Sequence, residues 1–375
     1  TLFMKQLPIE TAYVGFLVGI GGLWVSIKRE GRRGFVFFSL FLGAGFIALF
    51  SYLSNLSMDN PLFRAISMRF WQQPLILVFI WIGLGFSAAI SLFERQSASA
   101  VVEASGVEGS APSAGLPDWV RPAVAIVAVL CQVAINFRSQ DYSTDWEIHS
   151  YGKAIIGHLP ENSLLLSKGD LQTNSIRYLQ HCENFRSDVR VLDREMLTTP
   201  WMHRMVAAGY PEVVMPGKMY HPGHPNGFIW KVFLDANSPK FKIFMSNFDY
   251  YELDRTFAGD YDFLPYGIVN WLFPRREKFE IEKYITLSDR SLEVFTPELV
   301  KALQKYPDGT WEILTIRDFW ESMYRRAYFL TDWGLKNSDN RAALERAVSL
   351  FEELGSKNPA QPPWFYKNLG VAYSH

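Results

Sequence analysis

The sequence predicts a polytopic α-helical membrane region (four late helices), followed by a luminal α/β domain and C-terminal tetratricopeptide-like helices. Three observations lead to this prediction. Long uncharged apolar runs occur in residues 1–138, short strand and helix patterns alternate in residues 139–295, and a helical repeat pattern occurs in residues 296–375. The averages hide this division, because 49% hydrophobic content and a formal net charge of −1 also fit an ordinary globular protein.

Four apolar segments are predicted to cross the lipid bilayer. Three of them, at about residues 11–27, 34–54 and 73–93, reach or approach the roughly 20 apolar residues that a helix needs to span the hydrocarbon core. The fourth lies at about residues 119–137, and its apolar part is shorter. Trp119 lengthens it through the membrane interface, where tryptophan is favoured.

The loops between these segments predict the orientation of the chain. The short loop 28–33, "KREGRR", is strongly basic and is expected in the cytosol. Residues 95–118 are rich in Ser, Ala and Gly, which predicts a disordered cytosolic loop. The loop that contains "NPLFRAISMRFWQQP" then becomes luminal, and the fourth helix delivers every residue after Arg138 to the lumen. Without that fourth span, the large domain would be cytosolic.

The charge, the cysteines and the first residues of the chain limit its possible partners and indicate whether it is part of a longer protein. Near-neutral charge without a dense Lys/Arg run argues against nucleic acid as a partner. The two cysteines, Cys131 and Cys182, lie in different contexts and predict no disulfide framework. Because the chain begins at Thr1 and no signal peptide precedes the apolar segments, we expect it to be part of a longer protein.

Alternating strand and helix patterns after the membrane region predict a small α/β layer with parallel pairing. Its first strands are "SLLLS" at residues 163–167 and "DVRVLD" at residues 188–193, each followed by a helix. Further strand-like segments are "KVFLDA" at residues 231–236, "FKIFMS" at residues 241–246 and "YGIVNWLF" at residues 266–273.

Two segments near the C-terminus have the spacing of a tetratricopeptide repeat. "ALERAVSLFEELGSKNP" matches the second helix of one repeat, and "YKNLGVAY" matches the first helix of the next, which is expected to be truncated. The sequence Thr-Pro-Glu at residues 296–298 predicts the start of this helical region. The matching positions are Ala347, Phe351, Pro359, Leu369, Gly370 and Tyr373.

Three short motifs suggest chemistry, and each has a structural interpretation that we favour. Gly169-Asp170 resembles the start of a phosphate-binding loop but lacks both the G-x-G-x-x-G and the P-loop patterns, so Asp170 is expected to cap the following helix. Asp260 and Asp262 spell D-x-D, which can hold a divalent cation, but a solvated turn is the favoured interpretation. The loop "YHPGHP" is not expected to bind a metal, because no Cys or Glu clusters beside its histidines.

The predicted luminal loop holds candidate contacts for an anionic lipid headgroup. The guanidinium of Arg69 could bind a phosphate, while Trp71, Gln72 and Gln73 would lie at headgroup depth. The same residues also suit ordinary interfacial anchoring, which these residues alone favour. Asn55 begins an N-glycosylation sequon, but its closeness to the membrane argues against modification.

One long segment resembles a known family. "ENSLLLSKGDLQTNSIRYLQHCENFRSDVRVLDREMLTTPWM" resembles the segment that follows the membrane region in polytopic proteins of the glycosyltransferase-C type. A strand, a G-D turn, a helix reading YLQ, an R-x-D-V-R-V strand and a T-x-W element recur there in this order. "NPLFRAISMRFWQQP" resembles that family's late luminal loop, and "LPYGIVNWLFP" a strand of its soluble domain. The chain is most similar to endoplasmic reticulum O-mannosyltransferases that modify IPT domains of plexins and related receptors.

This resemblance implies transfer of mannose from a dolichyl-phosphate donor to Ser or Thr of folded receptor domains, without a metal or other cofactor. It also implies a general base in a first luminal loop, upstream of Thr1, so no catalytic residue is expected in this chain and the chain alone is expected to be inactive. Arg69 is the first candidate contact for the donor phosphate and Arg64 the second, with Trp71 and Gln72 as companions.

Two alternatives belong to other classes. The first is a non-enzymatic membrane scaffold that binds partners through its tetratricopeptide helices, which cytosolic repeats would favour. The second is a metal-dependent nucleotide-sugar transferase that uses Asp260 and Asp262 and needs manganese. A transporter is disfavoured, because no charged residue lies inside the apolar part of any of the predicted spans.

Overall fold

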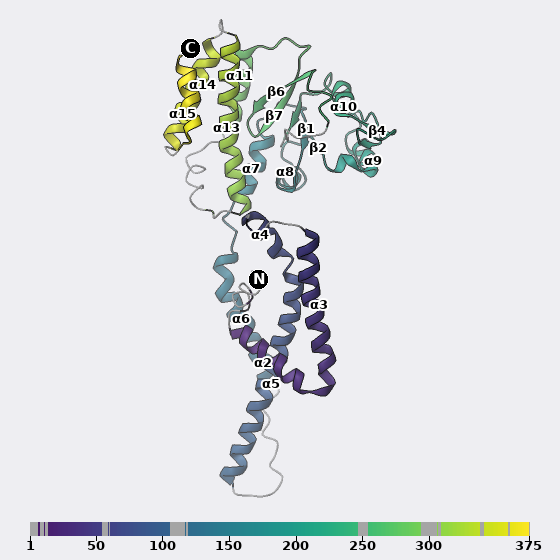
Figure 1. Cartoon of the computed structure of the whole chain (residues 1–375), viewed down its shortest axis with the longest axis vertical. Coiled ribbons are helices and arrows are strands. Elements are labelled where there is room, and N and C mark those ends of the chain that lie inside the picture. Colours follow the sequence, from purple (N-terminus) through teal and green to yellow (C-terminus); the bar gives the residue numbers. More distant parts are fainter. Residues whose placement is uncertain are drawn as a thin grey trace. The chain divides into compact units, whose positions relative to one another are not determined.

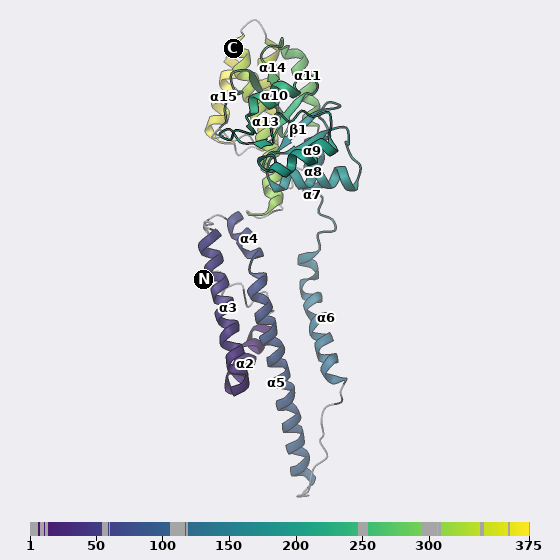
Figure 2. The same ribbon diagram turned by 90° about the vertical axis from the view of Figure 1, so that its right-hand side faces the viewer.

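The structure is a computed structural model that divides into two compact units, Thr1–Thr144 and Asp145–His375. Long helices make up the first unit, and the second contains a sheet covered by helices (Figures 1 and 2). The division lies close to the predicted boundary after Arg138. The described residues are 7, 11, 14–54, 59, 61–105, 117, 119–246, 254–293, 306, 309–337, 341–358 and 361–374.

The helices of the first unit differ in length. Two stretches, Gly31–Ser54 and Gln72–Gln96, are long and apolar enough to cross a membrane, judged by length and composition. Two of the predicted spans therefore pass this test, while the other two coincide with the shorter apolar helices Gly15–Lys28 and Pro122–Arg138. The helices are α2 (Val14–Lys28), α3 (Glu30–Ser54), α4 (Pro61–Arg69), α5 (Gln72–Ser105) and α6 (Val120–Gln140).

Helix α5 extends well past the predicted span. It continues to Ser105, so the prediction of a disordered loop from residue 95 is wrong for residues 95–105. Alanines and long straight-chain side chains in this stretch favour a helix, and no Pro or Gly interrupts it. In the remainder of the predicted loop, only Pro117 is among the described residues.

Glycines allow α2 and α5 to touch. A Cβ added to Gly22 would lie 2.1 Å from the carbonyl oxygen of Trp81, and a Cβ added to Gly85 would lie 2.1 Å from the carbonyl oxygen of Val18. No side chain fits in so short a gap, so the two backbones approach each other directly. Small residues commonly permit this kind of contact between helices in membranes.

The second unit is built on a mixed five-stranded sheet of order β2-β1-β5-β7-β6. Strand β1 pairs in parallel with β2 and with β5, whereas β7 is antiparallel to both β5 and β6. The predicted parallel pairing of the first two strands is therefore confirmed, but the sheet as a whole is mixed. The strands are β1 (Leu164–Ser167), β2 (Arg190–Asp193), β5 (Ile243–Met245), β6 (Tyr261–Tyr266) and β7 (Val269–Pro274), with a separate pair β3 (Met219–Tyr220) and β4 (Gly227–Phe228).

Two of the strand predictions need correction. "KVFLDA" lies in helix α10 (Trp230–Asn237), because Trp230, Phe233, Leu234 and Asn237 are buried at helical spacing. "YGIVNWLF" is a hairpin rather than one strand, since Tyr266 pairs with Val269 across a tight turn. Gly267 makes this turn with a φ of 57°, a conformation that glycine adopts without strain. "FKIFMS" does contain a strand, β5.

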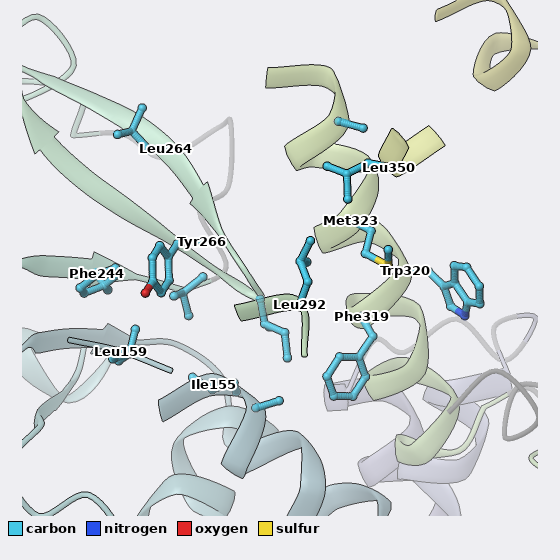
Figure 3. Close-up of a cluster of buried hydrophobic side chains, with 14 of the residues drawn as sticks. Ile155, Leu159, Phe244, Leu264, Tyr266, Leu292, Phe319, Trp320, Met323 and Leu350 are labelled. Carbon is cyan, nitrogen blue, oxygen red and sulfur yellow. The ribbon is translucent and has the colours of Figure 1, made fainter. Parts of the chain in front are cut away.

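Each face of the sheet has its own core. The side chain of Leu165 joins one cluster, while those of Leu164 and Leu166 join the other, as the alternation of a strand requires. In the first cluster, Phe244 and Tyr266 of the sheet lie in the same group as Phe319 of a long helix, α13 (Figure 3). The helices of this unit are α7 (Glu147–Ile156), α8 (Asp170–Cys182), α9 (Pro200–Gly209), α10, α11 (Ile281–Asp289), α13 (Trp311–Lys336), α14 (Arg341–Lys357) and α15 (Pro363–Ser374), with short 3-10 helices at Met196–Thr198 and Arg290–Leu292.

The C-terminal helices pack closely on one another. A Cβ added to Gly334 of α13 would lie 2.5 Å from Cγ of Leu344 in α14. Ala347 and Phe351, two of the predicted repeat positions, are fully buried. The assignment of these helices to a tetratricopeptide repeat stays a prediction, and Pro359 and residues 296–298 lie outside the described residues.

Candidate functional site

An apolar groove of about 680 Å³ lies among α2, α3 and α5 in the first unit. Its volume falls within the roughly 300–1,000 Å³ typical of ligand sites. Its walls include Phe16 and Leu23 from α2, Leu40 and Ala44 from α3, and Leu77 from α5. Walls of this kind accept a hydrocarbon chain, because a polar ligand would lose hydrogen bonds to water without replacement.

Small side chains on α3 open this groove. Ala44, Ala48 and Ser51 recur at intervals of four and three residues and all line it, so they share one face of the helix. This face of α3 was not predicted from the sequence, although the spacing of its small residues is a usable signal. The spacing indicates a groove only when α2 and α5 are known to lie beside the same face of α3.

The groove reaches the segment that holds the predicted phosphate contacts. Ser51 lies in the last turn of α3 and Pro74 in the first turn of α5, and both line the groove. Phe50 and Phe70 stack with their ring centroids 4.3 Å apart, which ties the end of α3 to the α4–α5 connection. The four candidate residues precede Pro74 in the sequence, and none of them lines the groove itself: Arg64, Arg69, Trp71 and Gln72.

The predicted contact residues have different surroundings. Arg64 and Arg69 are exposed on α4, and Arg69 stands in its last turn, where the helix dipole also favours a cation. Gln72 is exposed at the start of α5. Trp71 is only 9% exposed and belongs to the core of this unit, where it clusters with Val78. Its indole therefore packs inside the unit.

One further predicted site, the sequon residue Asn55, lies outside the described residues.

The Gly169-Asp170 turn joins β1 to α8. Gly169 is the N-cap, with a φ of 88° that favours glycine, and Asp170 is the first helical residue. No side-chain hydrogen bond caps the helix, so the prediction that Asp170 caps it is wrong. The hydroxyls of Ser167 and Thr173 lie 3.0 Å apart, and the Lys168 backbone N–H donates to Oγ of Ser246 at 3.1 Å. These contacts support the structural interpretation of the turn.

The D-x-D motif is held by ion pairs. Asp260 accepts from Nζ of Lys231 at 2.6 Å, and Asp262 accepts from Nε of Arg275 at 2.9 Å. Tyr261, between the two carboxylates, is buried at the start of β6. Within the described part of the chain, no three His, Cys, Asp or Glu residues are grouped so as to hold a metal ion. The geometry favours a structural role for both carboxylates.

The two histidines of "YHPGHP" close small turns. Nδ1 of His221 accepts from the Gly223 N–H at 3.2 Å, and Nδ1 of His224 accepts from the Asn226 N–H at 3.1 Å. An accepting Nδ1 places the proton of a neutral imidazole on Nε2. In each ring, Nδ1 then accepts a hydrogen bond and Nε2 carries the proton. Neither nitrogen has a free lone pair for a metal ion in this arrangement, which disfavours metal ligation.

Part of the second unit matches a known domain family. Residues 148–252 match a family model described as TMEM260-associated domain 2. The matched residues all lie in the second unit.

The particular relatives are protein O-mannosyl-transferases. The chain is 28% identical over 388 residues to Protein O-mannosyl-transferase tmem260 of Dictyostelium discoideum, an alignment that covers 100% of this chain and 46% of that protein. It is 26% identical over 386 residues to Protein O-mannosyl-transferase TMEM260 of Mus musculus, which covers 99% of this chain and 52% of that protein. The chain thus spans about half the length of the curated relatives it matches. The resemblance found in the sequence is confirmed, and no solved structure matches the chain.

Proposed function

We propose that this chain is part of a membrane glycosyltransferase that moves mannose from a dolichyl-phosphate donor to Ser or Thr of folded receptor domains. The observation that carries the proposal is similarity along the whole chain to two proteins named protein O-mannosyl-transferase. Because the chain matches about half of each relative, we assign activity to a longer protein and expect this chain alone to be inactive.

The hydrocarbon tail of the donor is proposed to lie in the groove among α2, α3 and α5. An isoprenoid chain is flexible and apolar, and close contact with Ala44, Ala48 and the larger apolar walls supplies dispersion energy. Helices in a bilayer gain little from the hydrophobic effect, so the fit of the groove to the chain matters more than its apolar area.

The phosphate of the donor is proposed to lie at the end of the groove near Pro74. Dolichyl phosphate leaves as an anion, and a nearby guanidinium stabilises the charge that develops on it. Arg69 is the first candidate, Arg64 the second, and Gln72 can add a hydrogen bond. With cations supplied by the protein, no metal is expected, and the general base is expected upstream of Thr1.

The location follows from the same proposal. A dolichyl-phosphate donor and secretory acceptors place the reaction at the endoplasmic reticulum membrane, with the second unit in the lumen. Helices α2 and α6 would complete a multi-pass region together with α3 and α5. The C-terminal helices are proposed to be tetratricopeptide-like and to face secretory proteins.

A complementation experiment tests the proposal. The longer protein, this chain alone and the longer protein with Arg69→Ala are expressed at matched levels in cells that lack the enzyme. O-linked hexose on a secreted IPT domain is then quantified by mass spectrometry. We expect the longer protein to restore the sugar, this chain alone to fail, and Arg69→Ala to lower it about tenfold or more, as for loss of one charge-stabilising group.

Each outcome has a distinct meaning. Activity of this chain alone would overturn the upstream placement of the general base. Normal activity of Arg69→Ala would exclude Arg69 as the phosphate contact and leave Arg64 as the candidate. Failure of the longer protein would refute the transferase assignment and favour a scaffold.

A further inference from the structure

A second, smaller pocket lies in the second unit, beside the amino end of β5. It has a volume of about 200 Å³ and is lined by the loop 238–242, by Trp271, Leu272 and Pro274 of β7, and by Glu277. Phe241 and Leu272 are buried, whereas Lys240, Lys242 and Glu277 are exposed. The pocket therefore has an apolar floor and a charged rim.

Three cations surround this pocket. Nζ of Lys242 lies 5.4 Å from the centroid of the Trp271 ring, where the ring holds the ammonium by a cation–π interaction. Lys240 donates to the backbone carbonyl of Glu212 at 3.4 Å, and Nη2 of Arg276 donates to Oγ of Ser238 at 2.8 Å. Ser238 and both lysines line the pocket directly.

The three cations at the pocket differ from several nearby cations in their ion pairs. Lys240, Lys242 and Arg276 form no ion pair with a carboxylate in the part of the chain that the structure describes. Three nearby cations do form one: Arg190 with Glu212 at 2.5 Å, Lys231 with Asp260 at 2.6 Å, and Arg275 with Asp262 at 2.9 Å. Among the described residues that line the pocket, only Glu277 on its rim thus offsets the positive charge of these three side chains.

The size of the pocket limits the ligand. A volume of about 200 Å³ is below the roughly 300–1,000 Å³ of sites for drug-sized molecules, so it suits one small group rather than a whole oligosaccharide. One face of the Trp271 indole is occupied by Lys242, which disfavours stacking of a sugar ring and leaves the ammonium positioned for an anion.

We propose that this pocket binds a single anionic group, a carboxylate or a phosphate. The ammonium of Lys242 is held in place by Trp271 before binding, which lowers the entropic cost of fixing it. Lys240 and Arg276 supply further charge, and Glu277 on the rim opposes binding. The ligand site is separate from the groove among α2, α3 and α5, and it does not depend on mannosyl transfer.

Calorimetric titration of the full chain in detergent micelles at low salt tests this site. The probes are inorganic phosphate and acetate, each titrated separately into matched protein. We expect a Kd of about 1 mM or tighter for at least one probe, typical of a small charged site. Lys242→Gln combined with Arg276→Gln should weaken that binding at least about tenfold, as expected for the loss of two charge-assisted contacts.

Two further variants make the test specific. Lys278→Gln removes one exposed positive charge next to Glu277 and should change Kd less than about twofold, because Lys278 does not line the pocket and acts on a bound anion only through water of high dielectric constant. Glu277→Gln should tighten binding several-fold, since it removes a repulsive charge. The probe that binds more tightly identifies the group as phosphate or carboxylate. Absence of binding by both probes, or an equal loss in Lys278→Gln, overturns the proposal.

Discussion

Arg186 joins separate segments of the second unit. Its Nη1 donates to the carbonyl oxygens of Ile156 and Gly157, each at 2.9 Å, and its Nε donates to Asp188 at 2.8 Å. It therefore satisfies carbonyls at the C-terminal end of α7 and fixes the approach to β2. The R-x-D part of the recurring strand motif thus has a structural explanation, which the motif alone did not provide.

Asp188 gives this contact a pH dependence. The hydrogen bond from Arg186 lowers the pKa of the Asp188 carboxyl, and the Asn162 backbone N–H lowers it further. Its stabilising contribution is therefore present above the unfolded pKa of about 3.9 and is lost as pH falls through the lower folded pKa. Asp188→Asn should lower the unfolding midpoint in urea at pH 7, and this difference should shrink progressively as the pH falls below 3.9.

The behaviour of Asp188→Asn at acid pH shows whether the charge of Asp188 causes the difference in stability. At acid pH both proteins carry a neutral side chain at this position, so their midpoints should converge. Arg204→Lys on the exposed face of α9 serves as a control without such dependence. A gap between wild type and Asp188→Asn that stays constant at every pH would contradict the assigned ion pair.

At the scale of elements, the crossing of α2 and α5 depends on Gly85. An added Cβ there would collide with the Val18 carbonyl at 2.1 Å, and backbone cannot move aside as a flexible side chain can. Gly85→Ala should lower the free energy of unfolding by about 1–3 kcal/mol, as overpacking commonly does. Gly83, on the same helix, has nothing within 4 Å of an added Cβ.

Thermal unfolding of the full chain in detergent distinguishes the two glycines. Gly83→Ala should leave the midpoint unchanged or raise it slightly, because Ala favours a helix. Equal destabilisation by both changes would contradict the close contact between α2 and α5 as the cause, because an added Cβ at Gly83 meets no neighbour.

The sequence predicted some elements well and others poorly, for physical reasons. Strands β1 and β2 were predictable because a short apolar run is followed by a helix pattern each time. Helix α10 was missed because "KVFLDA" is too short to separate helical from strand periodicity. The groove was missed because it exists only when three separate helices come together. Arg64 and Arg69 were identified by charge and context alone, and the structure adds that both are exposed on α4.

The whole molecule combines an apolar helical unit with a mixed α/β unit that carries its own contacts and pocket. The first unit offers room for a hydrocarbon chain, while the second matches the domain model over residues 148–252. The proposed division is therefore that the helices hold the lipid donor while the second unit faces proteins and small anions. This division makes the groove the most direct feature to test.

The decisive measurement is mannosyl transfer from dolichyl-phosphate mannose in microsomes that contain the longer protein, with Ala44→Phe compared with Gly45→Phe. Ala44 lines the groove, so a phenylalanine there fills it, whereas Gly45 is the adjacent residue on α3 and has nothing within 4 Å of an added Cβ. We predict that Ala44→Phe raises the KM for the donor about tenfold, equivalent to roughly 1.4 kcal/mol of binding, while Gly45→Phe leaves it unchanged. Equal donor KM values for Ala44→Phe, Gly45→Phe and wild type would contradict the assignment of the groove to the lipid tail.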